Sequence, residues 1–296
     1  MAEENRLQGR TAIVTGAAVG LGSAYAKALA AEQMNLVLCD VRNELHELVG
    51  ELKAAGHSVV AWQGDVADPD HVQRVVHGGK QAFGTIDVLI NNAGVWGASS
   101  AEDDAAKAMD DYRKILGTNL YGEFLFGRAV IPLMLDQGSG GEIVNIATDH
   151  MVTCGTPWHV CPQLEQCPWR DSPRITGGGD TMDIYDAAKW GLNGLLYSWS
   201  KALAPQGIRV NQFCMGATDS HMLRGFHNFD PPQSEVETWM KAEDNARVLV
   251  ELLQEGPQGR NAQNINFCIG RPVALEPPLP HRYVDPDDII VSEAGS

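Results

Sequence analysis

Short apolar runs alternate with helix-like segments along this chain, and this alternation restricts the possible folds more than any other feature. The apolar runs lie at 10–15, 35–39, 58–62, 86–90, 142–147, 208–214 and 264–269. Segments of helical character lie between them, at 21–31, 44–55, from 68 onward, 105–135, 182–204 and 242–254. Strand–helix alternation is typical of a parallel sheet with helices on both faces. We therefore predict an α/β fold built on one doubly wound parallel sheet.

Two segments break this alternation and set the expected boundaries. Residues 149–181 contain four prolines and the run Gly177-Gly178-Gly179, and residues 272–296 contain five prolines. Neither segment can be regular throughout. We predict a single domain over 1–271 that carries an insert at 149–181, followed by an irregular tail at 272–296.

The composition disfavours several classes of protein. The 296 residues include 38 acidic and 22 basic side chains, for a net charge of −16. This charge argues against a nucleic-acid partner and against an anionic membrane surface. No apolar run approaches the roughly 20 residues of a membrane-spanning helix, and the acidic N-terminus lacks the order of a signal peptide. We therefore expect a cytoplasmic protein.

A glycine-rich loop directly follows the first predicted strand. Gly16, Gly20, Leu21 and Gly22 lie between this strand and the first helix. Glycines let a backbone turn tightly and approach a pyrophosphate, which then lies against the helix N-terminus. The loop predicts a dinucleotide-binding site, and a turn that binds no ligand is the alternative.

Asp40 ends the second predicted strand, where it would discriminate between dinucleotides. A carboxylate in this place accepts hydrogen bonds from the adenosine ribose and repels a 2′-phosphate. Ala17 and Ala18 offer such a phosphate no basic group, and we expect Arg42 to face solvent at the start of a helix. This pattern favours NAD over NADP.

Tyr185 and Lys189 form a candidate acid–base pair. Residues four apart lie on one helical face, so the phenol and the ammonium can approach each other. A neighbouring cation favours the phenolate and lowers the pKa of a tyrosine. Tyr185 is therefore a plausible general acid or base, although such a pair on an arbitrary helix is commonly surface decoration.

The glycine loop and this pair occur in order with Asn91-Asn92-Ala93-Gly94, after the fourth strand, and with Asn119. Together these motifs resemble the short-chain dehydrogenase/reductase family over about 6–271. The resemblance implies a Rossmann-type fold that binds NAD. It implies further cofactor contacts, from Asp65, Val66, Asn91, Asn92, Ala93 and Gly94.

The same resemblance implies the catalytic roles. Tyr185 would exchange a proton with the substrate oxygen, and Lys189 would support Tyr185 and bind the nicotinamide ribose. Asn119 would hold a water in a proton relay through Lys189, with a helix-bending core residue as the alternative.

Two segments depart from the family pattern. Thr148 stands where the family has its substrate-orienting serine, and its hydroxyl can keep that role, although a silent loop residue is the alternative. Met215 replaces a usual proline before Gly216. We expect this loop to cover the nicotinamide, with Thr218 and Ser220 as polar contacts.

The insert at 149–181 adds roughly two dozen residues next to the predicted site. Its position makes it a candidate lid over the substrate, and a surface elaboration or an oligomer contact is the alternative. It also holds Cys154, Cys161 and Cys167. Their spacing lacks the short two-residue separation of typical zinc sites, so we predict no metal.

These features predict an NAD-dependent oxidoreductase that interconverts a secondary alcohol and a ketone. We expect an apolar pocket wall and hence a bulky cyclic or aromatic substrate, with the wall formed by Trp96, Trp158, Met215, Met222 and Phe226. The alternative is a catalytically silent NAD-binding sensor or scaffold. Helices 105–135 and 182–204 are apolar beyond one face. The resemblance implies that these helices pair subunits into a homodimer or homotetramer, and burial of both faces within one subunit is the alternative.

Overall fold

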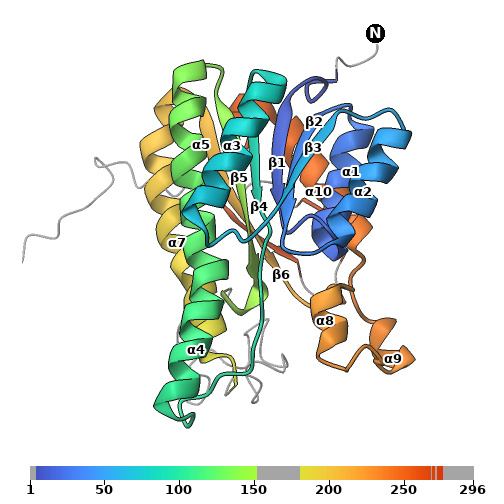
Figure 1. Cartoon of the computed structure of the whole chain (residues 1–296), viewed down its shortest axis with the longest axis vertical. Helices are drawn as coiled ribbons and strands as arrows, with labels where there is room; N and C mark the ends of the chain where they lie inside the picture. Colours follow the sequence, from blue (N-terminus) through green and yellow to red (C-terminus); the bar gives the residue numbers. More distant parts are fainter. Residues whose placement is uncertain (1–4, 152–180, 268, 271, 276–296) are drawn as a thin grey trace, which may run out of the picture.

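The computed structural model describes residues 5–151, 181–267, 269–270 and 272–275. In this part of the chain, seven strands form one parallel sheet in the order β3-β2-β1-β4-β5-β6-β7 (Figure 1). The strands are β1 (Thr11–Thr15), β2 (Asn35–Asp40), β3 (Val59–Gln63), β4 (Val88–Asn91), β5 (Gly141–Thr148), β6 (Ile208–Met215) and β7 (Asn264–Phe267). The predicted Rossmann-type parallel sheet is confirmed.

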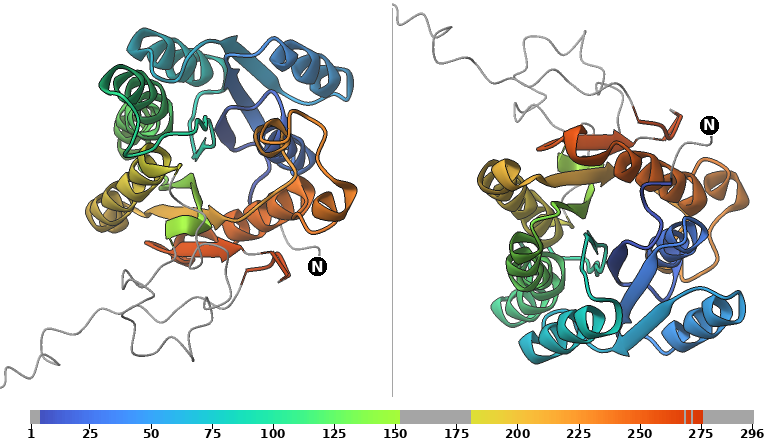
Figure 2. Two further views of the ribbon diagram at one scale, coloured as in Figure 1. Left: turned by 90° about the horizontal axis from the view of Figure 1, so that it is seen from below. Right: turned by 90° about the horizontal axis from the view of Figure 1, so that it is seen from above.

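Helices cover both faces of the sheet. One face carries α1 (Gly20–Ala31), α2 (Glu44–Ala54) and α10 (Ala242–Gln254). The other carries α3 (Pro69–Phe83), α5 (Glu123–Gln137) and α7 (Asp183–Leu203). Figure 2, which looks along the strands, shows these two helical layers on opposite sides of the sheet.

Because side chains alternate in direction along each strand, they pack into both layers. On β1, Ala12 and Val14 pack toward α1 and α10, whereas Ile13 packs toward the opposite layer. All three residues are fully buried. Successive side chains of a strand point to opposite faces, so a strand covered on both faces favours consecutive apolar residues, as at the centre of β1.

Three further helices extend beyond the carboxyl ends of the strands (Figure 1). They are α4 (Ala105–Leu116), α8 (His221–Gly225) and α9 (Gln233–Val236). The sheet order reverses between β1 and β4, because the chain runs outward from β1 to β3 and then returns. Ligands of open parallel sheets bind outside the carboxyl ends of the strands at such a reversal.

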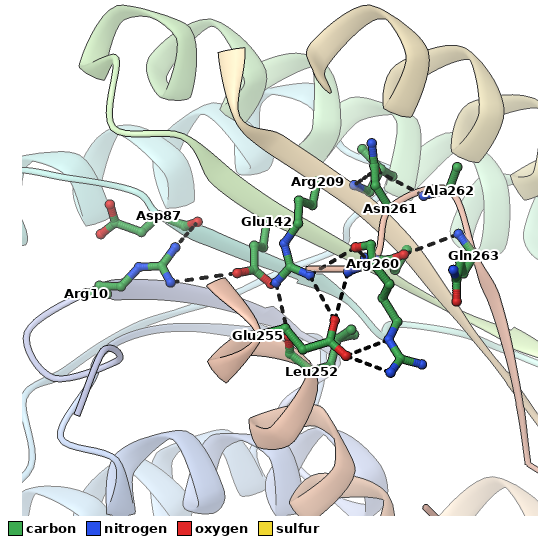
Figure 3. Close-up of polar contacts among 12 residues, drawn as sticks. Arg10, Asp87, Glu142, Arg209, Leu252, Glu255, Arg260, Asn261, Ala262 and Gln263 are labelled. Carbon is green, nitrogen blue, oxygen red and sulfur yellow. Dashed lines mark hydrogen bonds and ion pairs between the residues drawn. The ribbon is translucent and has the colours of Figure 1, made fainter. Parts of the chain in front are cut away.

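The opposite end of the sheet is held by buried ion pairs (Figure 3). Arg209 on β6 lies 2.6 Å from Glu142, its register partner on β5, and 3.4 Å from Glu255 after α10. Arg10 reaches Glu142 at 3.8 Å. Arg260 pairs with Glu255 at 2.6 Å. This network ties β5 and β6 to the end of α10, far from the carboxyl edge.

The structure corrects the long helix predicted at 105–135. It consists of α4 and α5 with a π-helical segment, Gly117–Gly122, between them. A π-helical turn inside an α-helix is rare and is frequently found at functional sites. No helix among the described residues is long and apolar enough to span a membrane.

Candidate functional site

A cavity of about 960 Å³ opens at the carboxyl edge of the sheet, where the strand order reverses. Residues after six of the strands, β1 to β6, line it together with residues of α1, α7 and α8. The lining includes all residues of the predicted cofactor site except Asn91: Gly16, Gly20, Leu21, Gly22, Asp40, Asp65, Val66, Asn92, Ala93, Gly94, Tyr185, Lys189, Gly216, Thr218 and Ser220.

The glycine loop has a shape that side chains would prevent. Gly16 and Gly20 have φ values of +63° and +58°, in the left-handed region that favours glycine. A Cβ on Gly22 would lie 2.0 Å from the carbonyl oxygen of Gly16, and a Cβ on Gly16 would lie 2.7 Å from Cα of Ala93. The loop is therefore packed closely against the end of β4.

The N-terminus of α1 fits an anionic group in this cavity. Its N-cap, Val19, has no side-chain acceptor, and the first turn contains no acidic residue. Val19, Gly20 and Leu21 all line the cavity. A helix N-terminus presents free N–H groups and a partial positive charge, which suits a phosphate. The residues present thus fit the pyrophosphate of a dinucleotide.

Asp40 is 7% exposed and organises the loop around it. Its Oδ2 accepts a hydrogen bond from the backbone N–H of Ala18 at 2.9 Å, and its Oδ1 accepts one from that of Arg42 at 3.0 Å. Arg42 does not simply face solvent as predicted, because it lines the cavity while its guanidinium pairs with Glu44 at 2.7 Å. The adenosine end of the site therefore contains both an acid and a base.

The two neighbouring asparagines at the end of β4 have different places. Asn92 lines the cavity and donates from Nδ2 to the carbonyl oxygens of Thr15 and Gly16, both at 3.0 Å. Asn91 is fully buried in the sheet, where its Nδ2 donates to Oδ1 of Asn145 at 3.0 Å. Asn92 thus fixes the glycine loop, whereas Asn91 is not among the cavity-lining residues.

The three candidate catalytic side chains that line the cavity come from two elements. Thr148 ends β5 and is 5% exposed, and Tyr185 and Lys189 lie one turn apart on α7. Nζ of Lys189 donates to the carbonyl oxygen of Ile146 at 2.6 Å. The sheet and one helix therefore bring a hydroxyl, a phenol and an ammonium to one cavity wall.

Asn119 lies in the π-helical segment and does not line the cavity. Its Nδ2 donates to the carbonyl oxygen of Val95 at 2.8 Å, and its Oδ1 accepts from the N–H of Val95 at the same distance. This reciprocal pair fixes the irregular segment that follows Gly94. Asn119 therefore acts on the site indirectly, by holding the backbone of Val95, which lines the cavity.

Two acidic contacts at the site were not predicted from the sequence. Glu123, at the start of α5, lies 3.2 Å from Nζ of Lys189 and is 3% exposed. His150, after β5, lies 2.7 Å from Asp186, and its ring meets that of Tyr185 edge-on at a centroid distance of 6.3 Å. A lone acid in the apolar stretch 120–126 is the one sequence signal that indicates Glu123.

Aromatic and sulfur-containing side chains form part of the cavity wall. Trp96 and Phe226 pack with ring centroids 4.1 Å apart, and Met215 and Met222 line the same cavity. Trp158 and the cysteines of the insert lie outside the described residues. Within those residues, no group of three metal-ligating side chains forms.

Comparison with known families matches most of the chain to oxidoreductases. A family model described as short chain dehydrogenase matches residues 10–155, and one described as enoyl-(acyl carrier protein) reductase matches residues 173–267. An oxidoreductase of Mycobacterium tuberculosis is 32% identical over 73% of this chain and 75% of its own. The trans-4-hydroxycyclohexanecarboxylate dehydrogenase of Sinomonas cyclohexanicum is 30% identical over 75% of this chain and 77% of its own.

Solved structures share the fold over nearly their whole length. Levodione reductase is 29% identical, with a TM-score of 0.73 over 88% of this chain and 97% of its own. Actinorhodin polyketide ketoreductase, solved with NADPH, is 25% identical, with a TM-score of 0.72 over 88% of this chain and 96% of its own.

Proposed function

Since this chain belongs to the short-chain dehydrogenase/reductase family, we propose that it oxidises a secondary alcohol to a ketone, or reduces the ketone, with NAD as cofactor. The observation that carries this proposal is the meeting of Thr148, Tyr185 and Lys189 with the glycine loop in one cavity. Two parts of the site are needed for such a reaction, a dinucleotide cradle and an acid–base group, and this cavity offers both.

The cofactor would lie along the carboxyl edge of the sheet. Its pyrophosphate suits the glycine loop and the N-terminus of α1, and its adenosine suits the pocket of Asp40, Asp65 and Val66. Gly216, Thr218 and Ser220 would border the nicotinamide from the loop after β6. The hydroxyl of Ser220 also caps α8 by accepting from the N–H of Leu223 at 3.2 Å.

The protein's own groups handle the proton. In oxidation, the Tyr185 phenolate takes the proton of the substrate hydroxyl, and in reduction the Tyr185 phenol returns it. Thr148 donates a hydrogen bond to the substrate oxygen, and the Lys189 ammonium stabilises the phenolate. Bound nicotinamide supplies the hydride acceptor in one direction and the hydride donor in the other. Asn119 acts as a positioning residue, and a relay water beside it stays a prediction.

The wall formed by Trp96, Phe226, Met215 and Met222 favours a bulky cyclic or aromatic substrate. Apolar side chains bury the ring of such a substrate, and the hydroxyl of Thr148 orients its oxygen. The relatives named for a hydroxycyclohexanecarboxylate and for levodione support a cyclic substrate.

Formation of NADH over a panel of cyclic and aromatic secondary alcohols tests this proposal. We expect turnover by the wild type and a loss of at least about a hundredfold in kcat for Tyr185→Phe, because general acid–base catalysis typically contributes that much. Tyr197→Phe, which removes a half-exposed hydroxyl of the same helix outside the cavity, is the matched control and should keep activity. Undiminished turnover in Tyr185→Phe would falsify the role given to Tyr185.

The second candidate is a silent NAD-binding sensor or scaffold. Calorimetry with NAD, read together with the turnover assay, separates it from the enzyme. Tight NAD binding without turnover on any alcohol of the panel supports the sensor, whereas turnover excludes it.

We also propose that the chain assembles into dimers or tetramers through α4, α5 and α7. These helices and the π-helical segment before α5 expose large side chains, between 38% and 55%, that an isolated chain would leave in water: Met109, Tyr112, Tyr121, Phe124, Leu135, Trp190 and Tyr197. Exposed apolar residues gathered on neighbouring elements are typical of a protein interface.

A further inference from the structure

A buried carboxylate lies behind the lysine of the site. Oε1 of Glu123 is 3.2 Å from Nζ of Lys189, and both side chains are almost fully buried. Lys189 lines the cavity and Glu123 does not. The ammonium therefore has the carboxylate on its inner side and the reaction cavity on its outer side.

This acid is held in an environment that does not suit a charge. Its second oxygen, Oε2, is buried and has no hydrogen-bond partner among the described residues. Burial raises the pKa of Glu123 to about 8, against the lowering effect of Lys189. Removing a carboxylate from water is energetically unfavourable, and an apolar residue of similar size would avoid that cost. The stability of the fold therefore does not by itself explain an acid at position 123.

Tyr185 lies one turn before Lys189 on α7 and both line the cavity, so in the proposed mechanism this one ammonium serves two acids. An ionised Glu123 neutralises the charge of Lys189, and a Tyr185 phenolate would then be a second anion next to a single cation. Groups coupled in this way titrate together, because each proton depends on the charge of the others. When Glu123 is neutral, the full charge of Lys189 is available to the phenolate.

We propose that Glu123 is a positioning residue that competes with Tyr185 for the charge of Lys189, and that it thereby sets the pH at which Tyr185 acts as a base. The carboxylate also holds Lys189, together with the carbonyl oxygen of Ile146 at 2.6 Å. The role of Tyr185 as a base rests on the proposed function. The effect of Glu123 on the titration of the Tyr185 phenol does not.

Few other charged groups act at this point. Among the described residues, Lys189 is the one charged group that affects Glu123, and β4 offers only the Nδ2 of Asn91, 3.5 Å from the backbone oxygen of Glu123. At the Tyr185 end, Asp149 lines the cavity, and His150 pairs with Asp186. Variants of Glu123 leave these groups unchanged, so their effect on the titration of Tyr185 is the same in wild type and variant.

The test measures the titration of Tyr185 by the ultraviolet absorbance of tyrosinate. Subtracting the curve of Tyr185→Phe from that of the wild type removes the other five of the six tyrosines. The same subtraction in the Glu123→Gln background gives the midpoint of Tyr185 without the competing acid. We expect it to fall by about one pH unit, the scale of shift that one neighbouring charge produces. The pH profile of kcat for alcohol oxidation should move in the same direction.

Two further variants serve as controls for this titration. Glu123→Asp keeps the acid but withdraws it by one methylene group, so its midpoint should lie between those of wild type and Glu123→Gln. Glu142→Gln, which neutralises a buried acid paired with Arg209 at the far end of the sheet, should leave the midpoint of Tyr185 unchanged.

An unchanged or raised midpoint in folded Glu123→Gln overturns the proposal. Should that variant fail to fold, a midpoint in Glu123→Asp that is not below that of the wild type overturns it equally. A wild type that oxidises no alcohol contradicts the proposed function alone, because the tyrosinate titration needs no turnover.

Discussion

At the scale of single residues, Asp40 should decide which dinucleotide is used. Asp40→Asn removes the charge that repels a 2′-phosphate, and its amide oxygen can still accept from the N–H of Ala18. Arg42 lines the same cavity and would meet that phosphate. We expect the ratio of kcat/KM with NAD to kcat/KM with NADP to fall about tenfold or more, which corresponds to about 1.4 kcal/mol.

The control for this variant is Asp65→Asn, a second acid of the cavity lining. Its neutralisation should affect both cofactors alike, because the adenine that it would border is the same in each. An unchanged ratio in Asp40→Asn contradicts the role given to Asp40. A wild type that prefers NADP contradicts the proposed choice of NAD.

The residue scale is also where sequence reasoning is least complete. It pointed to Tyr185 and Lys189 because a helical spacing of four is visible in the sequence. It missed Glu123 because a glutamate within a predicted helix normally faces solvent, and the burial of this one depends on the packing of α7, whose Lys189 lies 66 residues further along the chain. It placed Asn91 with the cofactor, although the side chain of Asn91 bonds to Asn145 inside the sheet.

At the scale of elements, the pair Glu142–Arg209 joins β5 to β6 (Figure 3). Arg209 also donates to the carbonyl oxygens of Leu252 and Arg260, both at 3.0 Å. Arg209→Met leaves Glu142 buried without its nearest cation, and we expect a loss of about 3–5 kcal/mol in the free energy of unfolding at pH 8. Urea unfolding measures this loss.

The loss should be smaller at pH 5. Burial raises the pKa of Glu142 from 4.5 to about 7, although Arg209 acts against this rise. A raised pKa means that the folded state binds the proton more tightly, so the stability from this group is present below 4.5 and is lost as pH rises through about 7. Without Arg209 the pKa rises further, and at pH 5 the protonated acid no longer needs a cation.

The matched control is Arg247→Met on α10, whose partner Glu251 is exposed. Exposed pairs contribute little, so this variant should change the free energy of unfolding by less than about 1 kcal/mol at either pH. Equal losses in Arg209→Met at pH 5 and pH 8 would show that Glu142 does not titrate in the folded state.

Element boundaries followed from the sequence where local chemistry fixes them. Asp68 accepts from the N–H of Asp70 and Pro69 follows it, so α3 begins where this cap and proline predict. The π-helical segment between α4 and α5 was not predictable in this way. Its extra residue per turn leaves the apolar pattern of 105–135 nearly continuous, and its position is fixed by the contact of Asn119 with Val95.

At the scale of the whole molecule, the described chain is one sheet with two helical layers, and its outer surface on α4, α5 and α7 remains rich in exposed aromatic rings. Tyr121 and Phe124 stack on each other there, with centroids 6.5 Å apart. The net charge of −16 makes close association of two chains costly unless apolar burial offsets the repulsion. These rings could supply that burial.

The double variant Tyr121→Glu and Tyr197→Glu tests this surface. It places one charge in the π-helical segment before α5 and one on α7, at positions 44% and 55% exposed, so each folded chain should tolerate it. An interface over these helices would have to bury both charges, and we expect light scattering to show that the mass falls from two or four chains to one.

Val41→Glu, at a position 61% exposed after β2, adds one such charge away from these helices and should leave the mass unchanged. A wild type that is already monomeric contradicts the proposed assembly. A double variant that keeps the full mass would place the contact on another face of the molecule.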